Sequence, residues 1–66
     1  MKTIKLSAIK WDPQGKGYNW ASEHTTASFY SQNDNITAAE AMANVEAQAE
    51  CRILECNLQI LDGFID

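Results

Sequence analysis

The sequence predicts an α+β domain in which a three-stranded antiparallel meander packs on one long C-terminal helix, in the order βββα. Apolar and polar residues alternate through the first eleven positions, and two further short β-type segments follow, separated by polar turns. After residue 36, apolar residues recur every three or four positions, which is the period of a helix. With 66 residues the chain forms one domain, residues 1–66, with a thin core.

The strands are expected in the first half of the chain. Ile4 and Leu6 face one side of a strand spanning 3–11, with lysine and serine on the other side. Residues 12–17 contain one proline and two glycines, which favour a hairpin loop of a few residues. The second and third strands are assigned to the aromatic-rich segments 18–22 and 27–31.

The helix start carries the best local signal. Thr37 is three residues before Glu40, the spacing of a capping box in which the hydroxyl accepts from the Glu40 amide and the carboxylate reaches back to the Thr37 amide. Past this point one apolar face runs along the helix and is expected to cover the sheet, and Asp62-Gly63 is the expected stop. That face consists of Ala38, Met42, Val45, Ala49, Ile53, Cys56 and Ile60.

A second apolar stripe on the same helix predicts an interface between two copies of the chain. A helix over 38–61 is about 36 Å long and overhangs a strand of about 17–20 Å. The sheet cannot cover both stripes, so we expect a homodimer. The stripe consists of Ala47, Cys51, Leu54, Leu58 and Leu61, and the dimer interface is assigned to Cys51, Leu54, Leu58 and Leu61.

The C-terminal half of this helix has an alternative interpretation. From 54 to 60, leucine, cysteine, leucine and isoleucine alternate with glutamate, asparagine and glutamine, which is the pattern of a fourth short strand. Against this, no glycine, proline or turn cluster separates Arg52 from the preceding helix, and leucine, glutamate and glutamine favour helix.

Charge and composition limit the class of protein. Residues 1–16 contain four lysines and one aspartate, a balance of +3, whereas residues 17–66 contain one arginine and eight acids, a balance of −7, giving −4 in all. This lacks the basic patch of a nucleic-acid binder. Two cysteines five residues apart fit reduced thiols, and no signal peptide or membrane span is visible, so we expect a mature, soluble, cytoplasmic protein.

Candidate catalytic residues are few. His24 is the only histidine and lies in a polar connection without a visible partner, and the acids of the helix are typical of a solvated face. No phosphate-binding loop, zinc spacing or nucleophile elbow occurs. We therefore expect no enzyme activity, no cofactor and no metal site.

Three segments resemble the HicB-like antitoxin domain family. They are Asp-Pro-Gln-Gly-Lys-Gly-Tyr at 12–18, Ser-Gln-Asn-Asp at 31–34 and the helix opening Thr-Ala-Ala-Glu-Ala-Met-Ala-Asn-Val at 37–45. The chain departs from the family at 22–26, where a Pro-Asp-Leu-Pro-Gly-like stretch is replaced, and it shows no DNA-binding segment. The resemblance implies a partial ribonuclease H-like fold without an active site and a toxin-neutralising role, with operator binding in doubt.

Two hypotheses follow for function. One is a protein-binding module of the antitoxin type that masks a partner's active surface. The other is a small acidic inhibitor from a phage or mobile element, of anti-CRISPR or anti-restriction type, that imitates nucleic acid by charge. In the first hypothesis aromatic side chains supply most of the binding energy, and in the second hypothesis carboxylates recognise the partner. The partner-binding residues are assigned to Trp20, Tyr30, Glu46, Glu50 and Glu55.

Overall fold

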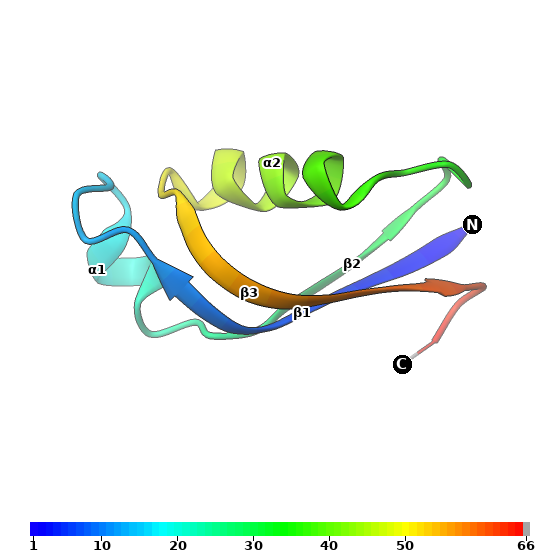
Figure 1. Ribbon diagram of the computed structural model, residues 1–66, viewed down its shortest axis with the longest axis horizontal. Helices are drawn as coiled ribbons and strands as arrows, with labels where there is room; N and C mark the ends of the chain where they lie inside the picture. Colours follow the sequence, from blue (N-terminus) through cyan, green and yellow to red (C-terminus); the bar gives the residue numbers. More distant parts are fainter. Residues whose placement is uncertain (66) are drawn as a thin grey trace.

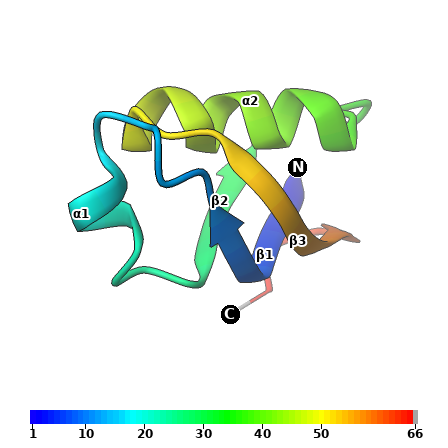
Figure 2. The same ribbon diagram turned by 60° about the vertical axis from the view of Figure 1, so that its left-hand side comes forward.

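The sheet has its first strand at the centre. The computed structural model describes residues 1–65, and within them β1 (Lys2–Trp11) lies between β2 (Ala27–Ser31) and β3 (Ile53–Asp62), antiparallel to both. Helix α2 (Ala38–Ala49) lies along one face of the curved sheet, and the short helix α1 (Tyr18–Ala21) lies at one end (Figures 1 and 2). The element order is therefore βαβαβ, and the predicted βββα meander with a long C-terminal helix is wrong.

The segment predicted as the second strand is a single helical turn. In α1 the amide of Ala21 donates to the carbonyl of Gly17 at 2.8 Å, and the amide of Ser22 donates to that of Tyr18 at 2.7 Å. The cause lies just before the turn, where the Gly17 amide donates to the Glu50 carbonyl at 3.0 Å. This contact holds the chain against the end of α2 and away from the edge of β1, so the aromatic residues cannot pair as a strand.

Helix α2 is 12 residues long and begins where the sequence predicts. Thr37 is the N-cap, and its hydroxyl oxygen accepts from the amide of Glu40 at 3.1 Å. The reciprocal half of the box differs, because the Thr37 hydroxyl donates to the Glu40 carboxylate at 3.2 Å. The buried face is narrow and consists of Ala41, Val45 and Ala49, so small side chains bring the helix close to the sheet.

The helix ends far earlier than predicted. Glu50 adopts a left-handed conformation (φ 55°, ψ 36°), and its amide donates to the Glu46 carbonyl, which closes the helix without a glycine. Residues 53–62 then form β3, so the alternative interpretation of 54–60 as a strand was the correct one. The cross-strand pairs Ile4↔Ile60 and Leu6↔Leu58 stabilise this segment as a strand. Local propensity could not predict this, because the preference for a strand depends on the neighbouring strand.

The loss of the long helix removes the second apolar stripe as a helical feature. Its members lie on three different segments of the chain, so they no longer share a face of one helix. Ala47 is exposed on α2, Cys51 is buried in the connection after it, and Leu54, Leu58 and Leu61 belong to β3.

The core lies between the sheet and α2. Ile4 and Leu6 are its largest fully buried apolar side chains, and both come from the central strand. Further along β1 the ladder with β3 shifts register on both sides of Lys10, and Ala8 has φ 50°. This bulge bends β1, and Ile9 and Trp11 beyond it are buried in the core.

Candidate functional site

An apolar pocket lies where α1, β2 and α2 meet. It has a volume of about 100 Å³, with Trp20 and His24 on one side, Ala27 and Phe29 of β2 on another, and Val45 of α2 among the residues that close it. Trp20 is 58% exposed although it is one of the largest apolar side chains in the protein. A wide-open tryptophan beside an apolar hollow is the kind of surface that partners bind.

The wall of the pocket is held in place by the core. The ring of Trp20 packs on that of His24, with centroids 4.2 Å apart and planes at 31°. The carbonyl of His24 accepts from Nε1 of Trp11 at 2.8 Å, and Trp11 is buried. The segment after α1 is therefore tied to β1 through a core side chain, so Trp20 is presented by a fixed surface although it lies on a single helical turn.

Size limits what the pocket can bind. Sites for metabolites and drug-sized ligands usually measure about 300–1,000 Å³, whereas an apolar cavity of about 150 Å³ holds one benzene ring. A hollow of about 100 Å³ therefore fits one apolar side chain and not a cofactor. Gln48 of α2 also lines it and supplies an amide able to bond to a partner's backbone.

A second depression lies over part of the sheet and is different in character. It is larger, about 520 Å³, but it is open, and Lys5, Ser7, Ser28 and Gln59 line much of it. Strand side chains without an enclosing wall leave a ligand largely hydrated, so this depression gives little binding energy. The smaller pocket is therefore the better candidate.

The structure separates the aromatic residues that were predicted to bind a partner together. Trp20 borders the pocket, whereas Tyr30 on β2 stacks on Phe64 after β3, with centroids 4.3 Å apart and planes at 19°. Tyr30 is not among the residues that line the pocket. The aromatic pairs of this protein thus belong to two separate places.

Two of the three predicted partner-binding carboxylates are engaged within the chain. Oε2 of Glu46 accepts from the amide of Ile53 at 2.7 Å, which secures the start of β3. Glu55 pairs with Lys10 across the sheet at 3.5 Å. Glu50 is the C-cap of α2. The three acids therefore have separate roles: Glu46 secures β3, Glu50 ends α2, and Glu55 forms an exposed ion pair that contributes little to stability.

The residues assigned to a dimer interface are also distributed. Cys51 is buried, and its Sγ lies 3.2 Å from the carbonyl oxygen of Asp12, to which it donates. Leu54 is 61% exposed, whereas Leu58 and Leu61 on β3 are half-buried. Cys51 thus has a structural role, and the three leucines are available to a partner only through the surface of β3.

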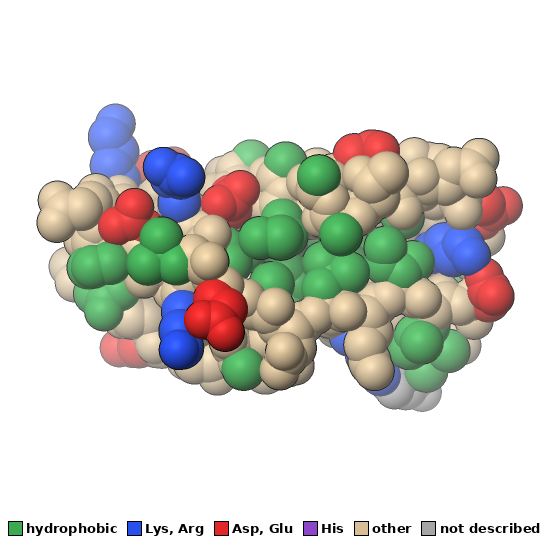
Figure 3. Space-filling model, in the orientation of Figure 1, with side chains coloured by type: hydrophobic (Ala, Val, Ile, Leu, Met, Phe, Trp, Pro, Cys, Tyr) green, Lys and Arg blue, Asp and Glu red, His purple; other side chains and the backbone are tan. Residues whose placement is uncertain are grey.

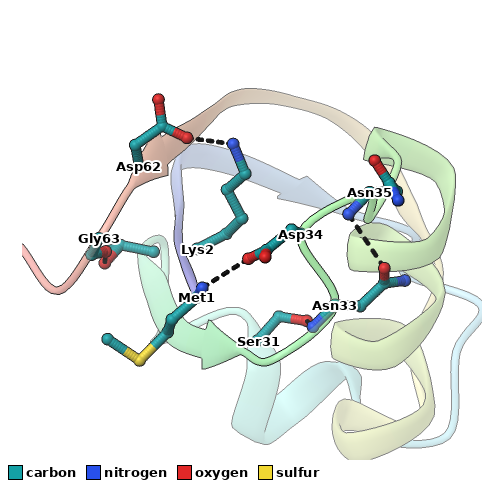
Figure 4. Close-up of polar contacts among 9 residues, drawn as sticks. Met1, Lys2, Ser31, Asn33, Asp34, Asn35, Asp62 and Gly63 are labelled. Atoms are coloured by element: carbon teal, nitrogen blue, oxygen red, sulfur yellow. Dashed lines mark hydrogen bonds and ion pairs between the residues drawn. The ribbon is translucent and has the colours of Figure 1, made fainter.

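Polar contacts tie the N-terminal residues both to the connection between β2 and α2 and to the C-terminal segment (Figure 4). The Met1 amino group pairs with Asp34, and Lys2 pairs with Asp62. The hydrogen bond from Lys2 holds the pKa of the Asp62 carboxyl below its usual value of 3.8, and the amino group does the same to the pKa of Asp34. Thr3 accepts from the amide of Ile65 at 3.0 Å, which adds an uncharged tie.

Sequence reasoning missed most of the pocket. The strand at 27–31 was predicted, but nothing in the sequence placed Phe29 beside His24 or Gln48, because these three residues lie on separate segments of the chain that meet only in the folded protein. The packing of Trp20 on His24 could not be inferred from their spacing either, because α1 ends at Ala21 and His24 lies after the turn that follows it.

In comparisons with known proteins, no family model, no curated protein and no solved structure matches the chain. Any functional assignment therefore rests on the geometry described above. Across residues 1–65, no group of three or more histidines, cysteines, aspartates or glutamates is placed to hold a metal ion. In that same stretch, no helix has the length and apolar character needed to cross a membrane.

Proposed function

We propose that this protein is a non-catalytic binding module that holds one apolar side chain of a partner protein in the pocket between α1, β2 and α2. The observation that carries the proposal is the exposed Trp20 beside an apolar hollow of about 100 Å³. Binding energy at protein interfaces concentrates in such places, where an aromatic residue borders a pocket that a partner's side chain fills.

The unpaired edge of β2 gives the partner a second point of attachment. β2 is a terminal strand of the sheet, and Ala27 and Phe29 on it line the pocket. An extended segment lying beside β2 can form main-chain hydrogen bonds while one of its side chains enters the hollow. The partner is therefore expected to present an extended segment with one large apolar residue.

The HicB-like resemblance would make that partner a toxin whose active surface the module masks. The acidic-inhibitor hypothesis makes it a nucleic-acid-processing complex, recognised through carboxylates. These readings differ in salt dependence, since steering between exposed charges is screened within about 10 Å at about 0.1 M salt. The engagement of the Glu46 carboxylate within the chain favours an apolar anchor as the main source of affinity.

Selection from a displayed peptide library tests the proposal directly. We expect the immobilised protein to enrich peptides with one conserved large apolar position, and Trp20→Ala to weaken their binding at least about tenfold, the loss typical of an interface hot spot. Tyr30→Ala is the matched control, because Tyr30 stacks on Phe64 instead of lining the pocket.

Three outcomes would contradict the proposal. They are the absence of any enriched peptide, equal binding to wild type and Trp20→Ala, and binding abolished by moderate salt while insensitive to Trp20→Ala. The last result would support the charge-imitating inhibitor instead. Circular dichroism of each variant establishes that the fold is retained.

A further inference from the structure

The outer edge of β3 is long and carries little that would prevent pairing with another strand. Within residues 1–65, β3 has ten residues and is bonded to another strand, β1, on one side only, and from 56 to 61 it has no charge and no proline. Proteins usually protect such edges with lysine, proline or a covering element, because unpaired amides and carbonyls attract another strand. An edge left open over this length indicates that something pairs with it.

The direction of its free backbone groups can be worked out from the ladder. Beyond the end of β3 the amide of Gly63 donates to the Met1 carbonyl at 3.0 Å, so odd-numbered residues turn their backbone groups towards β1. Even-numbered residues therefore direct theirs outwards. These residues are Cys56, Leu58, Ile60 and Asp62, against only Ser28 and Tyr30 on the outer edge of the five-residue β2.

Most of the residues whose backbone groups point away from β1 also have apolar side chains, which lie on the face of the sheet that α2 covers. Figure 3 shows hydrophobic side chains gathered in a band along the molecule between α2 and β3. On these two elements the half-buried hydrophobic residues packed against the core are Met42, Cys56, Leu58 and Ile60. A partner strand on β3 would cover this band and satisfy the free backbone groups in one step.

We propose that the partner is a second copy of this chain, whose β3 pairs antiparallel with the first across a two-fold axis. An axis perpendicular to the sheet keeps both α2 helices on the same face, so side chains of one face meet their equivalents. With Leu58 opposite its own symmetry mate, Cys56 lies opposite Ile60 on the apolar face, and Asn57 lies opposite Gln59 on the polar face. The regular part of β3 thus matches itself in character.

Charge does not oppose this pairing locally. The two acids that border the uncharged stretch are each matched within their own chain, Glu55 with Lys10 and Asp62 with Lys2. In the register centred on Leu58 neither acid faces another acid, because Glu55 lies opposite Leu61. What remains is the net charge of −4 on each chain, which repels at long range and is screened by salt.

Cross-linking tests both the dimer and its register. Ile60→Cys places a thiol opposite the native Cys56 of the second copy, in a hydrogen-bonded pair whose Cα atoms are about 5.5 Å apart, within disulfide range. Under mild oxidation we expect a covalent dimer on a non-reducing gel. Ile60→Cys combined with Cys56→Ser is the control, and it should remain uncross-linked because equivalent positions 60 are then far apart.

A matched pair of double variants tests the interface without touching the core. Asn57→Glu with Gln59→Glu places like charges opposite each other twice, and sedimentation equilibrium should show the dimer weakened at least about tenfold. Asn57→Lys with Gln59→Glu places opposite charges at the same sites and should leave the dimer at least as tight. Both positions are exposed, so each monomer keeps its fold.

The wild-type chain is expected to sediment as a dimer of 7.4 kDa protomers at tens of micromolar and to associate more tightly as salt is raised. A monomer under these conditions overturns the proposal, as does equal dimerisation of the two double variants. Cross-linking of the control to the same extent as Ile60→Cys overturns the register. None of these results bears on the pocket at β2, which lies at the other edge of the sheet.

Discussion

Replacing Gly17 with alanine should unfold much of this protein, although the backbone there suits any residue. Gly17 has φ −89°, so alanine is allowed and would ordinarily stabilise by about 0.4–1 kcal/mol through the unfolded chain. Space forbids it. A Cβ on Gly17 would lie 1.8 Å from the carbonyl oxygen of Ala49 and 3.0 Å from its carbonyl carbon.

The size of the loss in stability depends on which atoms must move to make room for the Cβ. Both nearby atoms belong to the backbone of α2, so no side chain can rotate away, and the loop must shift by roughly 1 Å. Such overpacking costs about 1–3 kcal/mol or more. The shift also breaks the 3.0 Å bond from the Gly17 amide to the Glu50 carbonyl, worth about 0.5–1.5 kcal/mol. We expect a loss of about 3 kcal/mol, comparable to the low end of total stability for a 66-residue domain.

Thermal unfolding followed by circular dichroism measures this, and Gly63→Ala is the matched control. Gly63 has φ +79° with nothing within 4 Å of a Cβ, so alanine there costs only backbone strain of about 1–2 kcal/mol. At about 4–8 °C per kcal/mol, Gly17→Ala should lower Tm by at least about 12 °C and clearly more than the control. A Gly17→Ala variant as stable as Gly63→Ala would show that the loop does not rest on α2.

Two non-glycine residues with positive φ give the opposite prediction. Ala8 at the β1 bulge (φ 50°) and Glu50 at the end of α2 (φ 55°) each carry left-handed backbone strain of about 1–2 kcal/mol. Ala8→Gly and Glu50→Gly should therefore each raise the free energy of unfolding, measured in urea, by up to about 1 kcal/mol. A lower free energy of unfolding in either variant would argue against a left-handed backbone at that residue. The depressed pKa of Asp62 stabilises the fold above its ordinary value of 3.8 and ceases to do so as pH falls through the lower folded value. Asp62→Asn should therefore flatten the acid limb of the stability curve below about pH 4, as Lys2→Met should, and parallel acid limbs would exclude the Lys2 pair as the cause.

Local chemistry determined several elements in advance. β1 was predicted because the alternation of Ile4 and Leu6 with polar residues has the two-residue period of a half-buried strand, and the strand at 27–31 was predicted from its aromatic residues. The start of α2 was predicted from Thr37, because a cap acts within one turn and needs no distant partner. Trp20 was assigned to partner binding from its residue type, and the structure adds that its side chain is exposed, whereas its binding to a partner stays a prediction.

Only the tertiary structure decided the rest. The leucine, glutamate and glutamine residues of 53–62 favour a helix by local propensity, but pairing with the edge of β1 selects the strand, through contacts such as Ile4↔Ile60 between residues far apart in the sequence. Residues 18–21 turn into a helix because Gly17 is bonded to the end of α2. The pocket beside Trp20 exists only because Phe29 and Val45 meet there, and such distant contacts leave no periodic trace in a single sequence.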